Sequence, residues 1–416
     1  MRMHACPRAG TLMFLKEALS ADPGPTEGML VSAFPAADPA ARLRRLVILG
    51  SADAALALVR DAHLHGLESV VFDIDEGPAL FSRHALAQRA ARATRSGDRH
   101  SLVRELRELG DPRHTALIAT SDDWLRRLVP VRSAIGDAYR HLLVPADDTL
   151  EICLDKLRFT QWCREQAVPH AASWCVGIED RPAKLQPPFI VRPALTRHGL
   201  REDRLPKAAV AADEASLADW LVRFKGAHAI PVVSQSLLDR PIRQFSIGFA
   251  RRPGRFLGFV TEKLRPRPQD CQVGSLVCLR DEPALLAFGR DIAERLDYVG
   301  IGELEVLVDG RTGERFVVEL NARPWRQYAM ASASGHDLLH VLTGVRARGL
   351  PRGQGSGLQW WAPLSDLANL AHDRAPGPLG IARMAARFGR TLASANVYAR
   401  FDWNDPAPAW PRRRHP

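Results

Sequence analysis

The chain has 416 residues, of which 46% are hydrophobic and 25% are charged. These values exclude a wholly disordered or collagen-like chain, and the length suits about two to three domains of roughly 150 residues each. The net charge is +10, but the basic residues are spread along the chain, and only Arg412 to Arg414 form a run. This spread disfavours a nucleic-acid-binding surface, which would gather its cations on one face.

The N-terminal segment and the cysteines indicate where the protein resides. No stretch of 18 apolar residues occurs, and the first residues lack the apolar core of a secretory signal, so we expect a cytoplasmic protein with no membrane partner. Residues 1–41 are rich in Ala, Pro and Gly without periodicity, and we interpret them as a loose leader. The six cysteines form no Cys-x-x-Cys pair, which favours buried reduced thiols over a disulfide framework or a zinc cluster.

Residues 42–150 have the pattern of an α/β domain. Apolar runs predict strands at 46–50, 69–73 and 115–119, and residues 52–65 have a helical pattern. Ser121 and the acidic residues after it are typical of a helix N-cap. Strands that alternate with helices predict a parallel sheet.

Residues 151–345 mix short strands with helices and predict an α+β region. We expect Asp155 to cap a helix at 156–167, and a second helix at 283–296. Predicted strands lie at 189–191, 231–233, 245–249 and 256–260, and strands at 303–308 and 315–320 form a hairpin around the turn 309–313. Residues 346–416 are interpreted as a linker, at 346–357, and a C-terminal extension.

The hairpin carries the strongest chemical signal. Strand alternation places Glu303 and Glu305 on one face of the first strand, and Glu319 and Asn321 on one face of the second. Acids that converge in this way repel one another unless cations lie between them, and oxygen ligands suit magnesium bound together with phosphates. The alternative is a solvated acidic face, which the apolar run at 316–318 disfavours.

These residues have a recognisable family pattern. The run Glu319-Leu-Asn-Ala-Arg323, with Glu303-Leu-Glu305 upstream, resembles the metal-binding hairpin of the ATP-grasp superfamily. Asp155-Lys156 and Pro188-Phe-Ile-Val-Arg192 resemble the segments that carry that family's two nucleotide-binding lysines. Val232-Val-Ser-Gln235 resembles the strand that contacts adenine, and Glu262-Lys263-Leu-Arg265 resembles a basic strand that faces the phosphates and the substrate.

The likeness runs in order through about residues 43 to 410 and is nearest to uncharacterised proteins related to the carbamoyl-phosphate synthase large chain. Ser82-Arg83-His84, Gly335-His336-Asp337-Leu338 and Asp405-Pro-Ala-Pro408 also look like that group.

The resemblance implies a fold, a reaction and a set of roles. The fold would be an α/β N-terminal domain of the Rossmann-like, pre-ATP-grasp type followed by an α+β ATP-grasp core. The reaction would be ATP-dependent ligation of a small-molecule carboxylate to an amine, or to a thiol, through an acyl phosphate, with ADP released and Mg²⁺ or Mn²⁺ as the ion. The implied nucleotide-binding residues are Lys156, Arg192 and Gln235, the metal ligands are Glu305, Glu319 and Asn321, and the catalytic residues are Arg323, Lys263 and Arg265.

Two departures from the family pattern keep alternatives open. Arg192 stands where the family usually has a lysine, and the loop at 194–199 has one glycine where the family commonly has several. A nucleotide-binding protein without turnover is therefore the second hypothesis. A basic nucleic-acid-binding protein, motivated only by net charge, is the third, and a homo-oligomer stays open.

Overall fold

The computed structural model describes residues 42–90, 92–195, 205–206, 208–237, 240–265, 274–351, 355–372 and 378–410. The described residues all belong to one compact unit that begins at Arg42. The predicted leader at 1–41 lies outside the described residues. Among the described helices, none combines the length and the apolar character that crossing a membrane requires.

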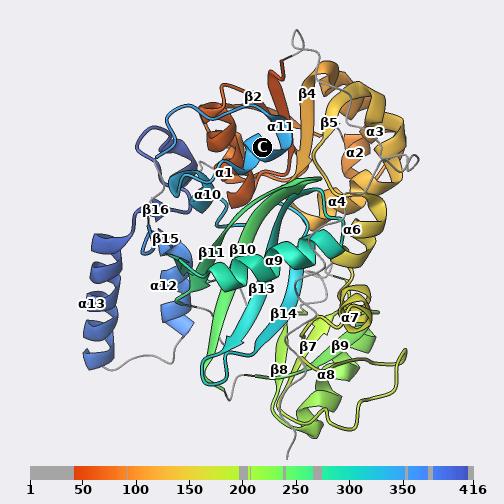
Figure 1. Cartoon of the computed structure of the whole chain (residues 1–416), viewed down its shortest axis with the longest axis vertical. Helices are drawn as coiled ribbons and strands as arrows, with labels where there is room; N and C mark the ends of the chain where they lie inside the picture. Colours follow the sequence, from red (N-terminus) through yellow and green to blue (C-terminus); the bar gives the residue numbers. More distant parts are fainter. Residues whose placement is uncertain are drawn as a thin grey trace, which may run out of the picture. The chain divides into compact units, whose positions relative to one another are not determined.

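A five-stranded parallel sheet begins the described chain (Figure 1). In spatial order its strands are β3 (Ala85–Arg89), β2 (Glu68–Asp73), β1 (Arg45–Leu49), β4 (Asp111–Ala119) and β5 (Tyr139–Leu142). Strand β1 lies at the centre and is buried from Leu46 to Leu49, which explains why its sequence is continuously apolar. The predicted strands at 46–50, 69–73 and 115–119 are confirmed, and the carboxyl ends of these parallel strands share one edge.

Short helices connect these strands. They are α1 (Asp53–Leu64), α2 (Arg92–Arg95), α3 (Arg99–Leu109), α4 (Asp122–Leu128) and α5 (Arg132–Ile135). The predicted N-cap of α4 is confirmed, since the Ser121 hydroxyl accepts from the Trp124 amide at 3.2 Å.

A four-stranded antiparallel sheet follows, with strand order β6-β9-β7-β8. The elements are α6 (Asp147–Leu154), α7 (Lys156–Glu165), β6 (Ser173–Cys175), β7 (Phe189–Pro193), β8 (Ala209–Ala211), α8 (Glu214–Gly226) and β9 (Pro231–Gln235). Helix α7 begins as predicted, because the Asp155 carboxylate accepts from the Leu157 amide at 2.8 Å. Phe189, Val191 and Phe224 belong to the small core between this sheet and α8.

A seven-stranded sheet forms the largest layer. Its strands, in spatial order, are β14 (Arg315–Asn321), β13 (Gly300–Asp309), β10 (Ile242–Arg252), β11 (Arg255–Lys263), β12 (Leu276–Arg280), β15 (Gln359–Trp361) and β16 (Val397–Tyr398). Helix α9 (Pro283–Arg295) crosses the strands on one face (Figure 1). Gly289 permits this packing, because a Cβ there would lie 2.8 Å from a methyl carbon of Ile247. The predicted hairpin is β13 and β14.

The C-terminal extension is built into the large sheet. After α10 (Ala329–Ala333) and α11 (Leu338–Thr343), strand β15 pairs antiparallel with β12, and β16 pairs parallel with β15. Helices α12 (Pro363–His372) and α13 (Pro378–Ser394) lie between these two strands in the sequence. The described parts of the predicted linker, 346–351 and 355–357, contain neither helix nor strand.

Asp405 joins the extension to the first sheet. Its carboxylate is 1% exposed and accepts from Arg60 Nε at 3.0 Å, from the Ser82 hydroxyl at 2.8 Å and from the Arg83 amide at 3.0 Å. Two motifs that lie more than 300 positions apart in the sequence therefore meet in one buried cluster.

Candidate active site

One cavity of about 850 Å³ lies where the three sheets meet. Its walls come from the carboxyl ends of β1, β2 and β4, from β7 and β9, from the start of α7, and from the β13–β14 hairpin. Every predicted site residue except Arg265 lines this cavity.

The hairpin register sets the position of the acids. Glu305 lies directly opposite Glu319, and Glu303 lies opposite Asn321. Beyond Glu305 the register shifts by one residue, so that Val306 pairs with Val317 and Val318 is left out of the pairing, as in a β-bulge. The predicted convergence of these side chains on one face is confirmed, since all four line the cavity. Directly opposed like charges destabilise a sheet unless cations compensate them.

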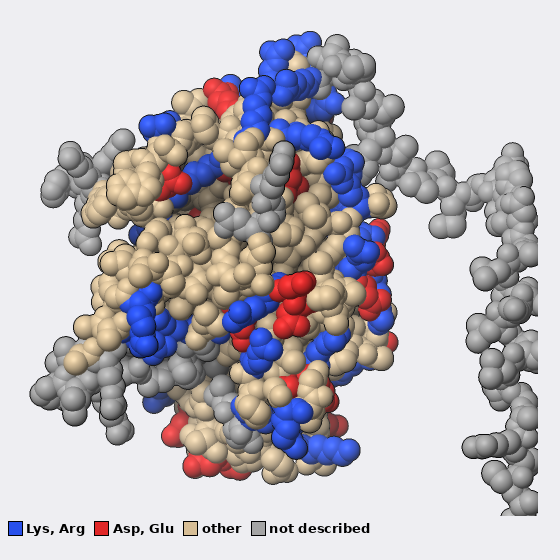
Figure 2. Space-filling model, turned by 60° about the vertical axis from the view of Figure 1, so that its left-hand side comes forward, with Lys and Arg blue, Asp and Glu red and all other residues tan. Residues whose placement is uncertain are grey.

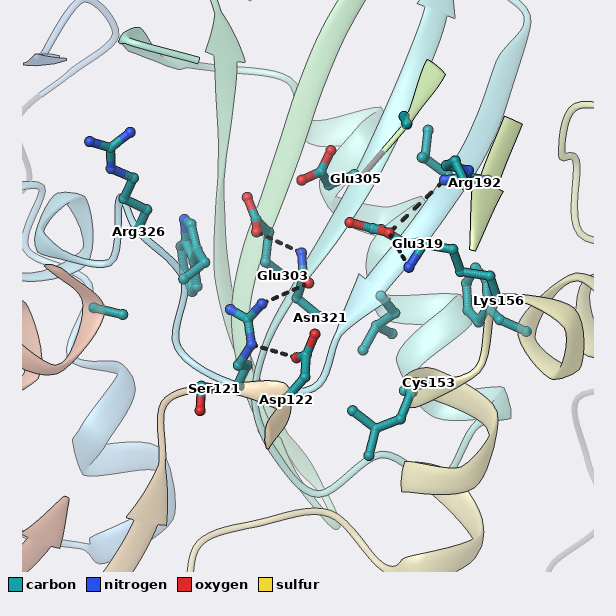
Figure 3. A pocket seen from close by; sticks show the side chains of 18 of the residues that line it. Ser121, Asp122, Cys153, Lys156, Arg192, Glu303, Glu305, Glu319, Asn321 and Arg326 are labelled. Atoms are coloured by element: carbon teal, nitrogen blue, oxygen red, sulfur yellow. Dashed lines mark hydrogen bonds and ion pairs between the residues drawn. The ribbon is translucent and has the colours of Figure 1, made fainter. Parts of the chain in front are cut away.

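Cations from three other elements supply that compensation. Lys263 Nζ lies 2.7 Å from Glu305 Oε2. Lys156 Nζ lies 3.7 Å from Glu319 Oε2 (Figure 3). Arg192 Nη1 lies 4.0 Å from the same Glu319 oxygen. These contacts bring α7, β7 and β11 to the hairpin.

The ion pairs fix the protonation of their members. Burial alone would raise the pKa of Glu319, but the charges of Lys156 and Arg192 hold it below its usual value. Burial would likewise lower the pKa of Lys263, but Glu305 and Glu303 raise it instead. Glu319 and Lys263 therefore both stay charged at neutral pH.

Glu303 differs from its neighbours, because burial, with the charge of Glu305 added, raises its pKa to about 7. Its Oε2 accepts from Asn321 Nδ2 at 3.0 Å. Arg323 Nη2 donates to Asn321 Oδ1 at 3.3 Å, and Arg323 Nε donates to Asp122 Oδ1 at 2.6 Å. Because Asp122 follows β4, Arg323 connects the hairpin to the edge of the parallel sheet.

The oxygen atoms of the hairpin suit one kind of metal site. No group of three or more His, Cys, Asp and Glu side chains in the described ranges is arranged to hold a metal ion. Glu305, Glu319 and the amide oxygen of Asn321 nevertheless offer oxygen atoms from paired strands, beside cations suited to phosphate. Magnesium usually takes one or two protein carboxylates and completes its sphere with water and phosphate oxygens, and these residues fit that kind of site.

Gln235 lines the cavity at the end of β9, and its Oε1 accepts from the Gln186 amide at 3.1 Å. Most of the loop with the single glycine lies outside the described residues.

Arg265 does not lie in the cavity. Its guanidinium contacts Asp366 on α12 and Thr391 on α13, and Ser275 completes the cluster with a 2.7 Å bond to Asp366. Strand β11 ends at Lys263, but the backbone of Arg265 still accepts from the Ser275 amide at 3.1 Å, so Arg265 stays beside β12 and its side chain reaches α12 and α13 instead of the cavity. The prediction that Arg265 faces the substrate is therefore corrected.

Sequence reasoning did not assign several residues of the cavity wall to the site, among them Asp122, Arg326 and Arg400. For Asp122, the polar residues directly after the buried strand β4 were the available signal. The two arginines had no local signal, because the chain contains many arginines and their position depends on long-range packing.

No protein-family model matches the sequence, and no curated protein matches it either. Solved structures do match. N5-carboxyaminoimidazole synthetase from Staphylococcus aureus complexed with ADP is 15% identical, with a TM-score of 0.57 over 75% of this chain and 79% of that one. Biotin carboxylase from Campylobacter jejuni, in an ATP-analogue complex, is 15% identical, with a TM-score of 0.55 over 77% and 75%. L-amino acid ligase from Bacillus licheniformis is 14% identical, with a TM-score of 0.53 over 73% and 74%.

These matches define the class of fold. The chain has the ATP-grasp fold, in which these ligases are built. At 14 to 15% identity the likeness extends to the fold.

Proposed function

We propose that the chain is an ADP-forming ligase that joins a small-molecule carboxylate to an amine through an acyl phosphate. One observation carries the proposal: two opposed carboxylates, Glu305 and Glu319, are each paired with a lysine in a single large cavity. The fold supports it, because structures that share this fold were solved with ADP and with an ATP analogue.

Each cavity residue has a role in this proposal. Lys156 and Arg192 bind the phosphates, and Gln235 contacts the adenine edge. Glu305, Glu319 and Asn321 hold magnesium, which when bound would neutralise phosphate charge. Lys263 and Arg323 face the transferred phosphoryl group or the substrate carboxylate.

The chemistry needs no protein nucleophile. A carboxylate oxygen attacks the γ-phosphorus, the bond from that phosphorus to the β,γ-bridging oxygen breaks, and ADP leaves. The amine nitrogen then attacks the acyl carbon, inorganic phosphate leaves, and the nitrogen loses a proton. The side chains contribute by holding the reactants in line and by neutralising charge.

Magnesium-dependent ADP release across a panel of carboxylates and amines tests the proposal. We expect release only when both substrates of a productive pair are present, and loss of release when EDTA removes the metal. Absence of ADP release for every pair, in a protein that binds ATP, would reject the ligase.

A nucleotide-binding protein without turnover is the second candidate. It is favoured by the 2.7 Å contact between Lys263 and Glu305, in which the lysine already neutralises a proposed metal ligand. The same assay separates the two, because this protein would bind ATP without releasing ADP. The nucleic-acid hypothesis is not supported by the face shown in Figure 2, on which Lys and Arg are interspersed with Asp and Glu.

A further inference from the structure

The cavity continues past the hairpin to the carboxyl edge of the parallel sheet. Gly50 and Ser51, which precede α1, and Arg326 and Arg400 line this part, which we call the second lobe. In Figure 3, Arg326 lies on the opposite side of Glu303 and Asn321 from Lys156 and Arg192. The second lobe is therefore distinct from the proposed phosphate side.

Asp53 holds two arginines in the second lobe. Its Oδ2 accepts from Arg326 Nε at 2.9 Å and its Oδ1 accepts from Arg400 Nε at 2.7 Å. Arg326 Nη2 also donates to the Ser365 hydroxyl at 2.6 Å. One carboxylate between two guanidinium groups leaves one net positive charge. Within the described ranges, Nη1 of Arg326 and both Nη atoms of Arg400 have no hydrogen-bond partner.

Two buried side chains of the cavity wall have unpaired donors. Trp325 is 2% exposed and Gln327 is 3% exposed, and both line the cavity. Trp325 Nε1 and Gln327 Nε2 have no hydrogen-bond partner in the described structure. Buried donors without partners are rare and costly, and a ligand that supplies acceptors offsets that cost.

The start of α1 adds donors of the same kind. Ala52 is the N-cap of this 12-residue helix and provides no side-chain hydrogen bond to its first turn. Free amide groups and the helix dipole favour an anion at such a position.

The carboxylates around the second lobe are already occupied or lie at its rim. Asp73 accepts from the Ser51 hydroxyl at 2.5 Å and from Trp124 Nε1 at 3.0 Å. Glu76 pairs with Arg89 at 2.9 Å, and Asp75 is exposed. The interior of the second lobe therefore presents donors in excess of acceptors.

We propose that the second lobe binds an anionic group, a carboxylate or a phosphate monoester, on one of the two molecules that are joined. Arg326 and Arg400 supply the charge, and Gln327 and Trp325 supply neutral donors. This inference deepens the proposed function, since it names the chemistry of a substrate, but binding of the anion does not require turnover.

Calorimetry on the full chain tests the inference. The protein is first saturated with MgADP, which occupies the side of Lys156 and Arg192, and is then titrated separately with glycerol 3-phosphate and with succinate. We expect one of the two probes to bind. Arg326→Gln and Arg400→Gln should each lower the affinity for that probe at least tenfold without changing ADP affinity. The probe that binds distinguishes a phosphate monoester from a carboxylate.

A control variant separates failure of this inference from failure of the proposed function. Should MgADP not bind, the same titrations are made without nucleotide, with Lys156→Ala beside Arg326→Gln. Probe binding that is lost in Lys156→Ala and kept in Arg326→Gln would assign the anion to the other lobe and overturn the inference. Binding of neither probe to the wild type would overturn it as well.

Gln327→Leu gives an independent measurement in a variant that is expected to fold. The substitution removes a buried amide nitrogen that has no partner in the described structure and keeps a similar side-chain volume, so the midpoint of urea unfolding without ligand should rise. Affinity for the binding probe should fall at least tenfold. A raised midpoint with unchanged probe affinity would show that Gln327 has only a structural role and would contradict its place in the second lobe.

Discussion

Glu319 is the carboxylate at which the cations of two different elements meet. We predict that Glu319→Gln lowers magnesium-dependent ADP release at least about 100-fold, because it removes a charge that both the proposed metal and the phosphates require. Stability should fall only modestly, because Lys156 and Arg192 lose a charged partner but the side chain is 30% exposed. Glu314→Gln, in the turn of the same hairpin with the side chain 57% exposed, is the matched control. Turnover in Glu319→Gln equal to that in the control would remove the metal assignment.

Lys156 belongs to the proposed phosphate contact. We predict that Lys156→Ala weakens ATP binding about tenfold or more, a loss of about 1.4 kcal/mol, as measured by calorimetry. Lys184→Ala, which removes an exposed lysine, should leave affinity unchanged. Equal affinities in the two variants would count against the assignment.

Glu303 gives a pH dependence whose sign follows from its surroundings. Because burial raises its pKa to about 7, the folded state binds a proton that the unfolded state releases near its ordinary pKa. Its contribution to stability is therefore complete below about pH 4.5 and is lost as the pH rises to about 7.

The wild-type free energy of unfolding should fall between pH 5 and pH 8, as measured by urea unfolding. We predict that this fall is smaller in Glu303→Gln by on the order of 1 to 3 kcal/mol. Asp61, whose burial raises its pKa to about 6, contributes with the same sign in both proteins. Only the difference between wild type and variant therefore reports on Glu303. Parallel pH profiles would contradict the prediction.

At the scale of elements, the sequence predicted the helices and strands that apolar runs, turns and caps within a short segment determine. Strands with long apolar runs, such as β1 and β10, were found, and so were the hairpin and the helix capped by Asp155. Strands β8 and β15 have three residues each and form because a neighbouring strand pairs with them. Such short segments have no sequence periodicity from which they could be predicted. Helix α8 was missed although its capping box, Asp213 with Ser216, was a usable signal.

The cap of α7 links an element to the site. We predict that Asp155→Ala lowers the free energy of unfolding by about 1 kcal/mol and also weakens nucleotide binding, because α7 begins with Lys156. Asp98→Ala removes the equivalent cap of α3, where Asp98 accepts from the His100 amide at 3.1 Å. It should cost similar stability and leave nucleotide affinity unchanged. An equal effect of both variants on affinity would show that the start of α7 does not position the lysine.

At the scale of the whole molecule, Asp405 holds distant segments together. We predict that Asp405→Ala lowers the free energy of unfolding by about 2 to 4 kcal/mol, because it leaves Arg60 and Ser82 without their buried acceptor. Asp137→Ala, which removes a side chain that is 70% exposed in a surface ion pair, should cost less than about 1 kcal/mol. Urea unfolding of both variants measures the difference, and similar values would show that the Asp405 cluster adds little.

The complete cavity could not be predicted at this scale. Its wall combines Gly50, Lys156, Glu319 and Arg400, which come from parts of the chain that local patterns treat separately. The family resemblance placed the hairpin and the lysines in order along the chain. The pairing of Arg326 and Arg400 across Asp53 depends on how the extension returns to the first sheet, and only the folded structure contains that information.

The pairing of β15 with β12 has a consequence for any shortened form of the protein. A chain that stopped at residue 345 would lack both β15 and β16, and β12 would become an open border of the large sheet with a free row of amide and carbonyl groups. Borders of this kind recruit strands from other molecules, so the shortened chain should self-associate as its concentration rises.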